Sequence, residues 1–148
     1  MVLAALALVA ASAATATIVP QRGIAGVRLG MSKAQVRAVL GAPRRGLRGR
    51  NEFGSFLEMR YRRLAVVLQG GSTVTSIRTS RRSERTRSGV GVGSTETQLR
   101  AGVQGLRCRT EFGVRHCFLG RFLPGRRVTD FRIRQGRVAN VTLGFVID

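Results

Sequence analysis

The sequence predicts an α+β protein built from two tandem repeats, each a helix followed by an antiparallel sheet. Two observations lead to this fold class. Residues 26–38 recur as residues 89–101, with Gly, Val, Gly, Gln, Arg and Ala identical at six equivalent positions. After each copy, apolar and polar residues alternate in short segments that are separated by glycine-containing turns, as in half-buried strands. Each repeat is therefore expected to form a two-layer α/β sandwich, with its helix covering one face of its sheet.

The helix in each copy is predicted from its first turn. Ser32 and Gln35 have the spacing of a capping box, in which the hydroxyl and the Gln side chain satisfy backbone N–H groups at the helix start. Thr95 and Gln98 have the same spacing in the second copy. Gly41 is suited to end the first helix, whereas the second copy has no glycine or proline at the matching positions.

The strands follow the helices in a similar order in both copies. The predicted strands are residues 56–61, 64–68 and 74–79 in the first copy and 128–134 and 138–147 in the second. The predicted domains are a signal peptide (1–16), an N-terminal extension (17–23), a first α+β repeat (24–79), a Ser/Arg-rich linker (80–88) and a second α+β repeat (89–148). The linker is assigned because it contains no apolar residue.

Residues 26–43 read G-V-x-L-G-M-S-x-x-Q-V-x-x-x-L-G-x-P. This pattern resembles the signature of SmpA/BamE-like and β-lactamase-inhibitory-protein-like domains, which are small extracytoplasmic α+β units and occur in tandem in inhibitory proteins. The second copy departs from the pattern at Ser94 and Gln104. The resemblance implies an exported, non-catalytic binding module for protein–protein interaction, of the inhibitor or envelope-assembly type. No cysteine lies near the predicted cleavage region, so a lipid anchor is not expected.

The first 16 residues are small and apolar and contain Ala-x-Ala sites, as in a secretory signal peptide. No Lys or Arg precedes Arg22, so the usual basic start of such a peptide is missing, and the alternative is a cytosolic protein with an apolar tail. Export is the preferred interpretation, which predicts an extracytoplasmic mature chain. No transmembrane span is expected in that mature chain.

The chain carries 26 basic and 7 acidic residues, a formal net charge of +19, and all of its basic residues except Lys33 are arginines. Such a charge favours anionic partners, although a GC-rich genome would also favour arginine over lysine. Four arginines are predicted to lie on the sheet face away from the helices: Arg60, Arg78, Arg132 and Arg134. They could bind a protein or, alternatively, an anionic envelope polymer or nucleic acid. The remaining interpretation is an ordinary solvated sheet face.

Cys108 and Cys117 are placed symmetrically about a turn at Phe112 and Gly113. In a hairpin centred on this turn they face each other as a non-hydrogen-bonded pair, where Cα atoms approach to about 4.5 Å, which suits a disulfide in an exported protein. The alternative is a redox or metal site that includes His116, but one His and two Cys lack a fourth ligand and the usual spacing. No catalytic constellation, metal site or cofactor site is predicted, so an enzyme is not expected.

Overall fold

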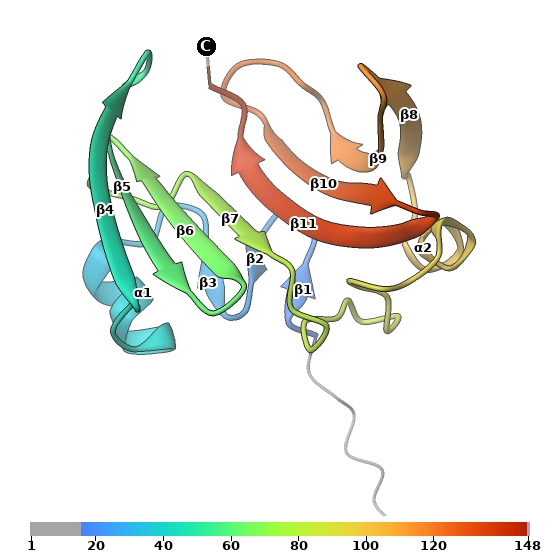
Figure 1. Ribbon diagram of the computed structural model, residues 1–148, viewed down its shortest axis with the longest axis horizontal. Helices are drawn as coiled ribbons and strands as arrows, with labels where there is room; N and C mark the ends of the chain where they lie inside the picture. The colour runs from blue at the N-terminus through green and yellow to red at the C-terminus, as the bar shows by residue number, and fades with distance from the viewer. Residues whose placement is uncertain (1–15, 148) are drawn as a thin grey trace, which may run out of the picture.

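The computed structural model describes residues 16–147, which form one large sheet, one small sheet and two short helices (Figure 1). The predicted signal peptide falls almost entirely outside the described residues. The elements, in chain order, are β1 (Ile18–Val19), β2 (Gly23–Ile24), β3 (Val27–Arg28), α1 (Lys33–Leu40), β4 (Arg45–Asn51), β5 (Gly54–Tyr61), β6 (Leu64–Gln69), β7 (Ser76–Thr79), α2 (Glu96–Gly102), β8 (Arg107–Glu111), β9 (Val114–Gly120), β10 (Arg127–Arg134) and β11 (Arg137–Phe145).

The large sheet has eight antiparallel strands in the order β4-β5-β6-β7-β11-β10-β9-β8. Strands β4 to β7 follow α1 and strands β8 to β11 follow α2. The two groups join where β7 pairs with β11, with Ile77 opposite Leu143. In Figure 1 the sheet is curved: β4 at one end and β8 and β9 at the other rise on either side of β7 and β11. The helices and the small sheet lie along its lower side in this view.

The predicted α+β fold of two helix-plus-sheet sandwiches is wrong. The described chain is mostly β, with 49% strand and 11% helix, and the strands that follow the two helices form one continuous eight-stranded sheet rather than two separate sheets. The helices have only 8 and 7 residues and bury a single residue each, so neither can cover a sheet face as a layer. Residues 45–51, which the sequence does not predict as a strand, form β4. The small sheet formed by β1, β2 and β3 also escapes prediction, because its strands have two residues each.

Both predicted capping boxes are confirmed. Ser32 accepts a hydrogen bond from the Gln35 N–H at 3.2 Å, and the Gln35 side chain accepts from the Ser32 N–H at 2.9 Å. Thr95 and Gln98 form the same pair of bonds in α2. Gly41 closes α1 with a φ of 78°, in the left-handed region where a side chain would be strained. In the second copy Gln104 stands at the position that matches Gly41, and α2 ends instead at an extended residue, Val103.

One hydrophobic core holds these parts together on one side of the large sheet. Alternate residues of the strands point into it, with Met59, Ile77 and Phe131 nearly or fully buried. The cluster also includes Val36 of α1, Leu99 of α2, and Ile18, Ile24 and Val27 of the small sheet. Since the cluster draws on both groups of four strands, the two groups share their main source of stability.

The segment predicted as a linker, residues 80–88, connects β7 to the loop before α2. The backbone N–H groups of Thr17 and Ile18 both donate to the Arg85 carbonyl at 2.9 Å, and the Arg85 N–H donates to the Thr17 hydroxyl. Glu84 and Thr86 are buried although the segment has no apolar side chain. The segment therefore packs against the start of the small sheet. Within residues 16–147, neither helix is long and apolar enough to cross a membrane.

Candidate binding surface

The face of the large sheet opposite the core is not covered by a helix, and we call it the open face. The strand register places one row of residues across all eight strands of this face. From the β4 edge to the β8 edge, the row consists of Arg45, Arg60, Ala65, Arg78, Thr142, Asp130, Phe118 and Arg107. The row arises because successive side chains of a strand point to opposite faces of the sheet. The residues that alternate with the core residues therefore all lie on the open face.

The predicted binding residues Arg60 of β5 and Arg78 of β7 lie in this row, with strand β6 between them, and both are exposed. They line one hollow of about 580 Å³ together with Arg63 and Asn140. Arg60 is partly neutralised, because its Nε donates to Glu58 Oε1 at 2.6 Å. That hydrogen bond and the charge of Glu58 raise the pKa of the Arg60 guanidinium above its ordinary value.

The other two predicted residues lie further along β10 and are exposed as well. Arg132 is opposite Asn140 of β11 and His116 of β9. Arg134 is at the end of β10, opposite Arg137, and lines a neighbouring hollow of about 520 Å³. The structure therefore places Arg60 and Arg78 in one hollow and Arg134 in the adjoining one, and it places Arg132 between Asn140 and His116. Their role in binding stays a prediction.

Three hollows adjoin one another from the open face towards α2, because each shares lining residues with the next. The first two share Arg63 and Ser80, and the second shares Arg82, Gly93 and Arg137 with a third hollow of about 760 Å³. We call this series the arginine groove. Its arginines are Arg60, Arg63, Arg78, Arg82, Arg85, Arg134 and Arg137, and Glu58 is the acidic residue that lines it.

A cluster around His116 occupies the β8–β9–β10 end of the open face. The imidazole Nδ1 lies 2.7 Å from Asp130 Oδ1, and Nε2 lies 3.4 Å from Glu111 Oε2. Burial raises the pKa of the Asp130 carboxyl, and the hydrogen bond from His116 opposes this effect. Because both imidazole nitrogens face carboxylates, neither is directed at a nucleophile.

Aromatic rings and an arginine complete the His116 cluster. The imidazole stacks on Phe118 with the ring centres 5.3 Å apart, and Phe118 meets the edge of Phe122 at 4.9 Å. The guanidinium of Arg109 lies 4.8 Å from the centre of the Phe118 ring and 5.3 Å from that of Phe122. Arginine and phenylalanine are both enriched in protein interfaces, and of these two rings Phe122 is exposed whereas Phe118 is buried.

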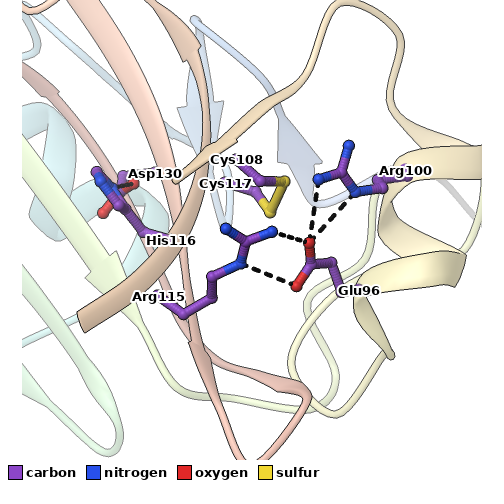
Figure 2. The surroundings of a disulfide bond; sticks show 7 residues. All are labelled: Glu96, Arg100, Cys108, Arg115, His116, Cys117 and Asp130. Atoms are coloured by element: carbon purple, nitrogen blue, oxygen red, sulfur yellow. Dashed lines mark hydrogen bonds and ion pairs between the residues drawn. A yellow bond between two sulfur atoms is a disulfide. The ribbon is translucent and has the colours of Figure 1, made fainter. Parts of the chain in front are cut away.

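Sequence reasoning missed this cluster because it considered His116 only beside the cysteines. The signal was present in the hairpin register, which the structure confirms by pairing Arg109 with His116 and Cys108 with Cys117. The same alternation that sends Cys117 into the core sends His116 and Phe118 to the other face. Figure 2 shows His116 and Asp130 on one side of the sheet and the disulfide on the other.

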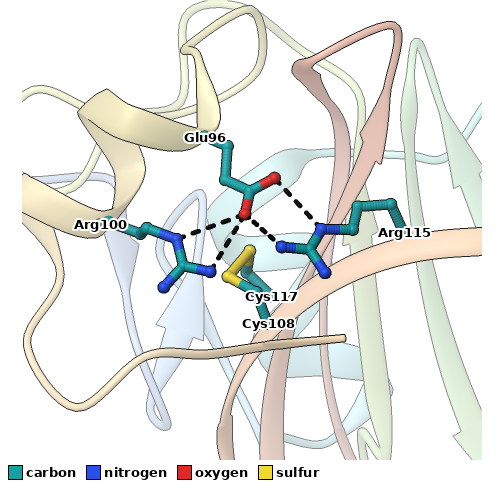
Figure 3. Close-up of polar contacts among 5 residues, drawn as sticks. All are labelled: Glu96, Arg100, Cys108, Arg115 and Cys117. Atoms are coloured by element: carbon teal, nitrogen blue, oxygen red, sulfur yellow. Dashed lines mark hydrogen bonds and ion pairs between the residues drawn. A yellow bond between two sulfur atoms is a disulfide. The ribbon is translucent and has the colours of Figure 1, made fainter. Parts of the chain in front are cut away.

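The predicted disulfide between Cys108 and Cys117 is confirmed, with the Cα atoms 3.9 Å apart. It lies beside an ion-pair network that ties α2 to β9 (Figure 3). Glu96 Oε1 accepts from Arg115 at 2.6 Å and from Arg100 at 3.1 Å. Among the described residues, Glu96 and the two cysteines are close enough to suggest a metal site. The two sulfur atoms are bonded to each other, however, and are not free thiolate ligands.

Comparisons with known proteins identify a similar fold and no family. No protein-family model and no curated protein matches the chain. A crystal structure of an extracellular protein containing a SCP domain from Bacillus anthracis str. Ames is similar, with a TM-score of 0.54 and 7% sequence identity. The match covers 79% of this chain and 44% of that one, so this chain spans less than half of its length. At this identity the similarity concerns the fold alone, and the resemblance to SmpA/BamE-like and β-lactamase-inhibitory-protein-like domains stays a prediction.

Proposed function

We propose that this protein is an exported, non-catalytic binding protein whose open face binds a protein partner with an acidic surface. The observation that carries the proposal is the uncovered, curved face of the eight-stranded sheet, which combines exposed arginines with the exposed Phe122 ring beside Arg109. An uncovered sheet face offers a broad contact area, and arginines beside aromatic rings supply the anchors that interfaces use. The Cys108–Cys117 disulfide supports an extracytoplasmic location, because disulfides persist in oxidising compartments.

The charge balance of the described residues supports an acidic partner. The carboxylates of Glu58, Glu84, Glu96, Glu111 and Asp130 are each within ion-pair distance of a basic side chain of the same chain. Few carboxylates therefore remain to offset the large excess of arginines. Complementary charge on a partner would speed association and select against basic proteins.

The arrangement of His116, the one histidine of the chain, supports the non-catalytic part of the proposal. Its two ring nitrogens face Asp130 and Glu111, and its ring is stacked on Phe118. This geometry fixes the imidazole between carboxylates instead of directing it at a nucleophile. This arrangement is consistent with a binding role for the cluster.

A second candidate function is the binding of an anionic polymer, and the arginine groove favours it. The groove adjoins the open face and has arginines along its whole course. A flexible polyanion could follow it, with binding that weakens steeply as salt rises. A protein partner anchored by aromatic rings would be held with a smaller salt dependence, because apolar contacts are not screened.

One pull-down from an extracytoplasmic extract separates these functions. The wild type is compared with a quadruple variant in which Arg60, Arg78, Arg132 and Arg134 are replaced by Gln. The matched control replaces four exposed arginines away from the open face and the groove, Arg37, Arg50, Arg62 and Arg87, by Gln.

The proposal expects a protein that the wild type and the control retain at about 0.15 M salt and that the quadruple variant loses. If nucleic acid or polysaccharide binds at about 0.01 M salt and all of it is released at about 0.15 M salt, the second function is supported instead. Equal retention by all three proteins contradicts a role for the open face.

A further inference from the structure

Two hollows adjoin each other where the β1–β2 turn contacts the end of β9 and the start of β10. One has a volume of about 730 Å³ and is lined by Pro20, Gln21, Arg22, Gly120, Arg121, Gly125, Arg126 and Arg127. The other has a volume of about 480 Å³ and extends towards Arg28 of β3 and Gln35 of α1. Arg22 and Arg127 belong to both linings, so the hollows adjoin. Their volumes lie within the range of small-molecule pockets, about 300–1,000 Å³.

All charged side chains that line these two hollows are basic. Five arginines from three segments line them, and neither lining contains an acidic residue. Within residues 16–147, no ion pair involves Arg22, Arg28, Arg121 or Arg126. Bringing several guanidinium groups together costs free energy through their mutual repulsion, and a bound anion would relieve that cost.

Gln21 forms a rigid base for the larger hollow. Its backbone N–H donates to Thr129 Oγ1 at 2.7 Å, its Nε2 donates to the Arg127 carbonyl at 3.0 Å, and its Oε1 accepts from the Thr129 hydroxyl at 2.9 Å. Its carbonyl accepts from Arg127 Nη1 at 3.2 Å. These four bonds hold Gln21 at a φ of 65°, a left-handed conformation that a residue with a side chain seldom adopts. Such strained residues persist where the surroundings determine their position, and they gather at functional sites.

Gly120, at the end of β9, allows the β1–β2 turn and the start of β10 to approach each other closely. Its φ of 95° is one that side chains rarely adopt, and a Cβ there would collide with the Arg127 carbonyl oxygen. The same Cβ would lie 2.8 Å from Gln21 Nε2. The β1–β2 turn is thus fastened to the end of β9 and β10, with Arg22 brought to the same hollow as Arg121 and Arg126.

We propose that these hollows form a phosphate-binding site, separate from the open face. Thr129, to which Gln21 is bonded, is fully buried and lies next in sequence to Asp130 of the open-face row, so its side chain is on the other side of the sheet. Arginine binds phosphate through paired N–H groups, and several arginines can share one phosphate's negative charge. The ligand is a phosphate group, carried either by a soluble molecule or by a lipid headgroup.

The test measures binding of inorganic pyrophosphate by calorimetry at about 0.15 M salt. The site variant combines R22Q and R121Q, because Arg127 is used in the base of the hollow. The matched control combines R62Q and R87Q, two exposed arginines that line neither hollow. We expect saturable binding by the wild type, weakened about tenfold or more in the site variant and changed less than about twofold in the control.

The proposal is overturned if pyrophosphate does not bind the wild type saturably. It is also overturned if both variants lose affinity equally, because that would indicate a general effect of net charge. Circular dichroism checks that the variants are folded. If the R22Q and R121Q chain does not fold, R22K with R121K keeps the charge and removes the paired geometry, and its affinity should still fall clearly below that of the wild type. Unchanged affinity in the lysine variant overturns the assignment of paired arginine contacts.

The source of the phosphate is decided by sedimentation with phosphatidylcholine vesicles that contain phosphatidic acid. Vesicle binding that the site variant loses and the control keeps assigns the site to a lipid headgroup. Pyrophosphate binding without such vesicle binding assigns it to a soluble phosphate compound. These outcomes do not depend on the arginines tested on the open face, so either proposal can fail without the other.

Discussion

At the scale of single residues, Glu96 connects two elements that the chain places 19 residues apart. It accepts from Arg115 of β9 and from Arg100 of its own helix, and these partners lower the pKa of its carboxyl, Arg115 most strongly. Replacing Glu96 with Gln should lower the free energy of unfolding by about 0.5–1 kcal/mol at neutral pH, a small effect because the side chains stay in contact with water. Urea denaturation measures it.

The pH dependence of this effect has a definite sign. The folded-state pKa of Glu96 is below its ordinary value of 4.5, so its contribution to stability is present above pH 4.5 and is lost as the pH falls through the lowered pKa. The difference between wild type and Glu96→Gln should therefore shrink in acid. Glu52→Gln serves as the control, since no ion pair of Glu52 occurs among the described residues. A difference that grows in acid would contradict the account.

Phe118 is the second residue whose packing predicts a measurable change in the free energy of unfolding. It points to the open face, yet it is only 5% exposed, because Phe122, Arg109 and His116 surround it. Phe118→Ala should lower the free energy of unfolding by about 2–4 kcal/mol through lost packing. The control is Phe112→Ala at the tip of the same hairpin, where the ring is fully exposed, and the expected change is within about 0.5 kcal/mol. Similar losses in both variants would show that the cluster is not packed as described.

At the scale of elements, the disulfide stabilises the hairpin at one end of the sheet. Strand β8 is an edge strand that pairs only with β9, and the bond between Cys108 and Cys117 joins them across 9 residues of sequence. Replacing both cysteines with Ser should lower the free energy of unfolding by roughly 1–3 kcal/mol, since the closed loop is short. Hydrogen exchange should lose protection first in β8 and β9. Equal loss along β4 and β5 would mean that the bond acts on the whole fold.

Local patterns predicted several of these elements well. The capping boxes at Ser32 and Thr95 and the register of the Phe112 hairpin depend on residues a few positions apart, so the sequence contains all the information they need. The alternation that assigned Arg60 and Arg78 to the side away from the core is local in the same sense. Such features were predicted correctly because neighbouring residues and local backbone geometry determine them.

Features that depend on contacts distant in sequence were not predicted. The pairing of Ile77 with Leu143 merges the strands into one sheet, but each strand alone is equally compatible with ending a separate sheet. The sequence also gave no sign that Gln21 would bond to Thr129, 108 residues away. The His116 cluster was missed for a similar reason, since Asp130 lies on a third strand.

At the scale of the whole molecule, net charge should control stability. The formal charge of +19 is carried by 148 residues, and the resulting repulsion destabilises the compact state. Raising sodium chloride from about 0.01 M to about 0.15 M shortens the Debye length from about 30 Å to about 8 Å. We therefore expect the melting temperature to rise over this range. A melting temperature that falls would show that ion pairs, rather than repulsion, dominate the electrostatics.

The order of strands has a consequence for how copies of this protein behave in a crowded solution. An eight-stranded sheet that does not close leaves two edges, β4 and β8, whose backbone N–H and C=O groups can template the growth of a fibre. Strand β4 carries Arg45, Arg48 and Arg50, and β8 carries Arg107 and Arg109. Any two edges that approach each other thus bring arginines together, so the edges resist joining. The glycines at positions 46 and 49 further weaken β4 as a template, because glycine is a poor strand former.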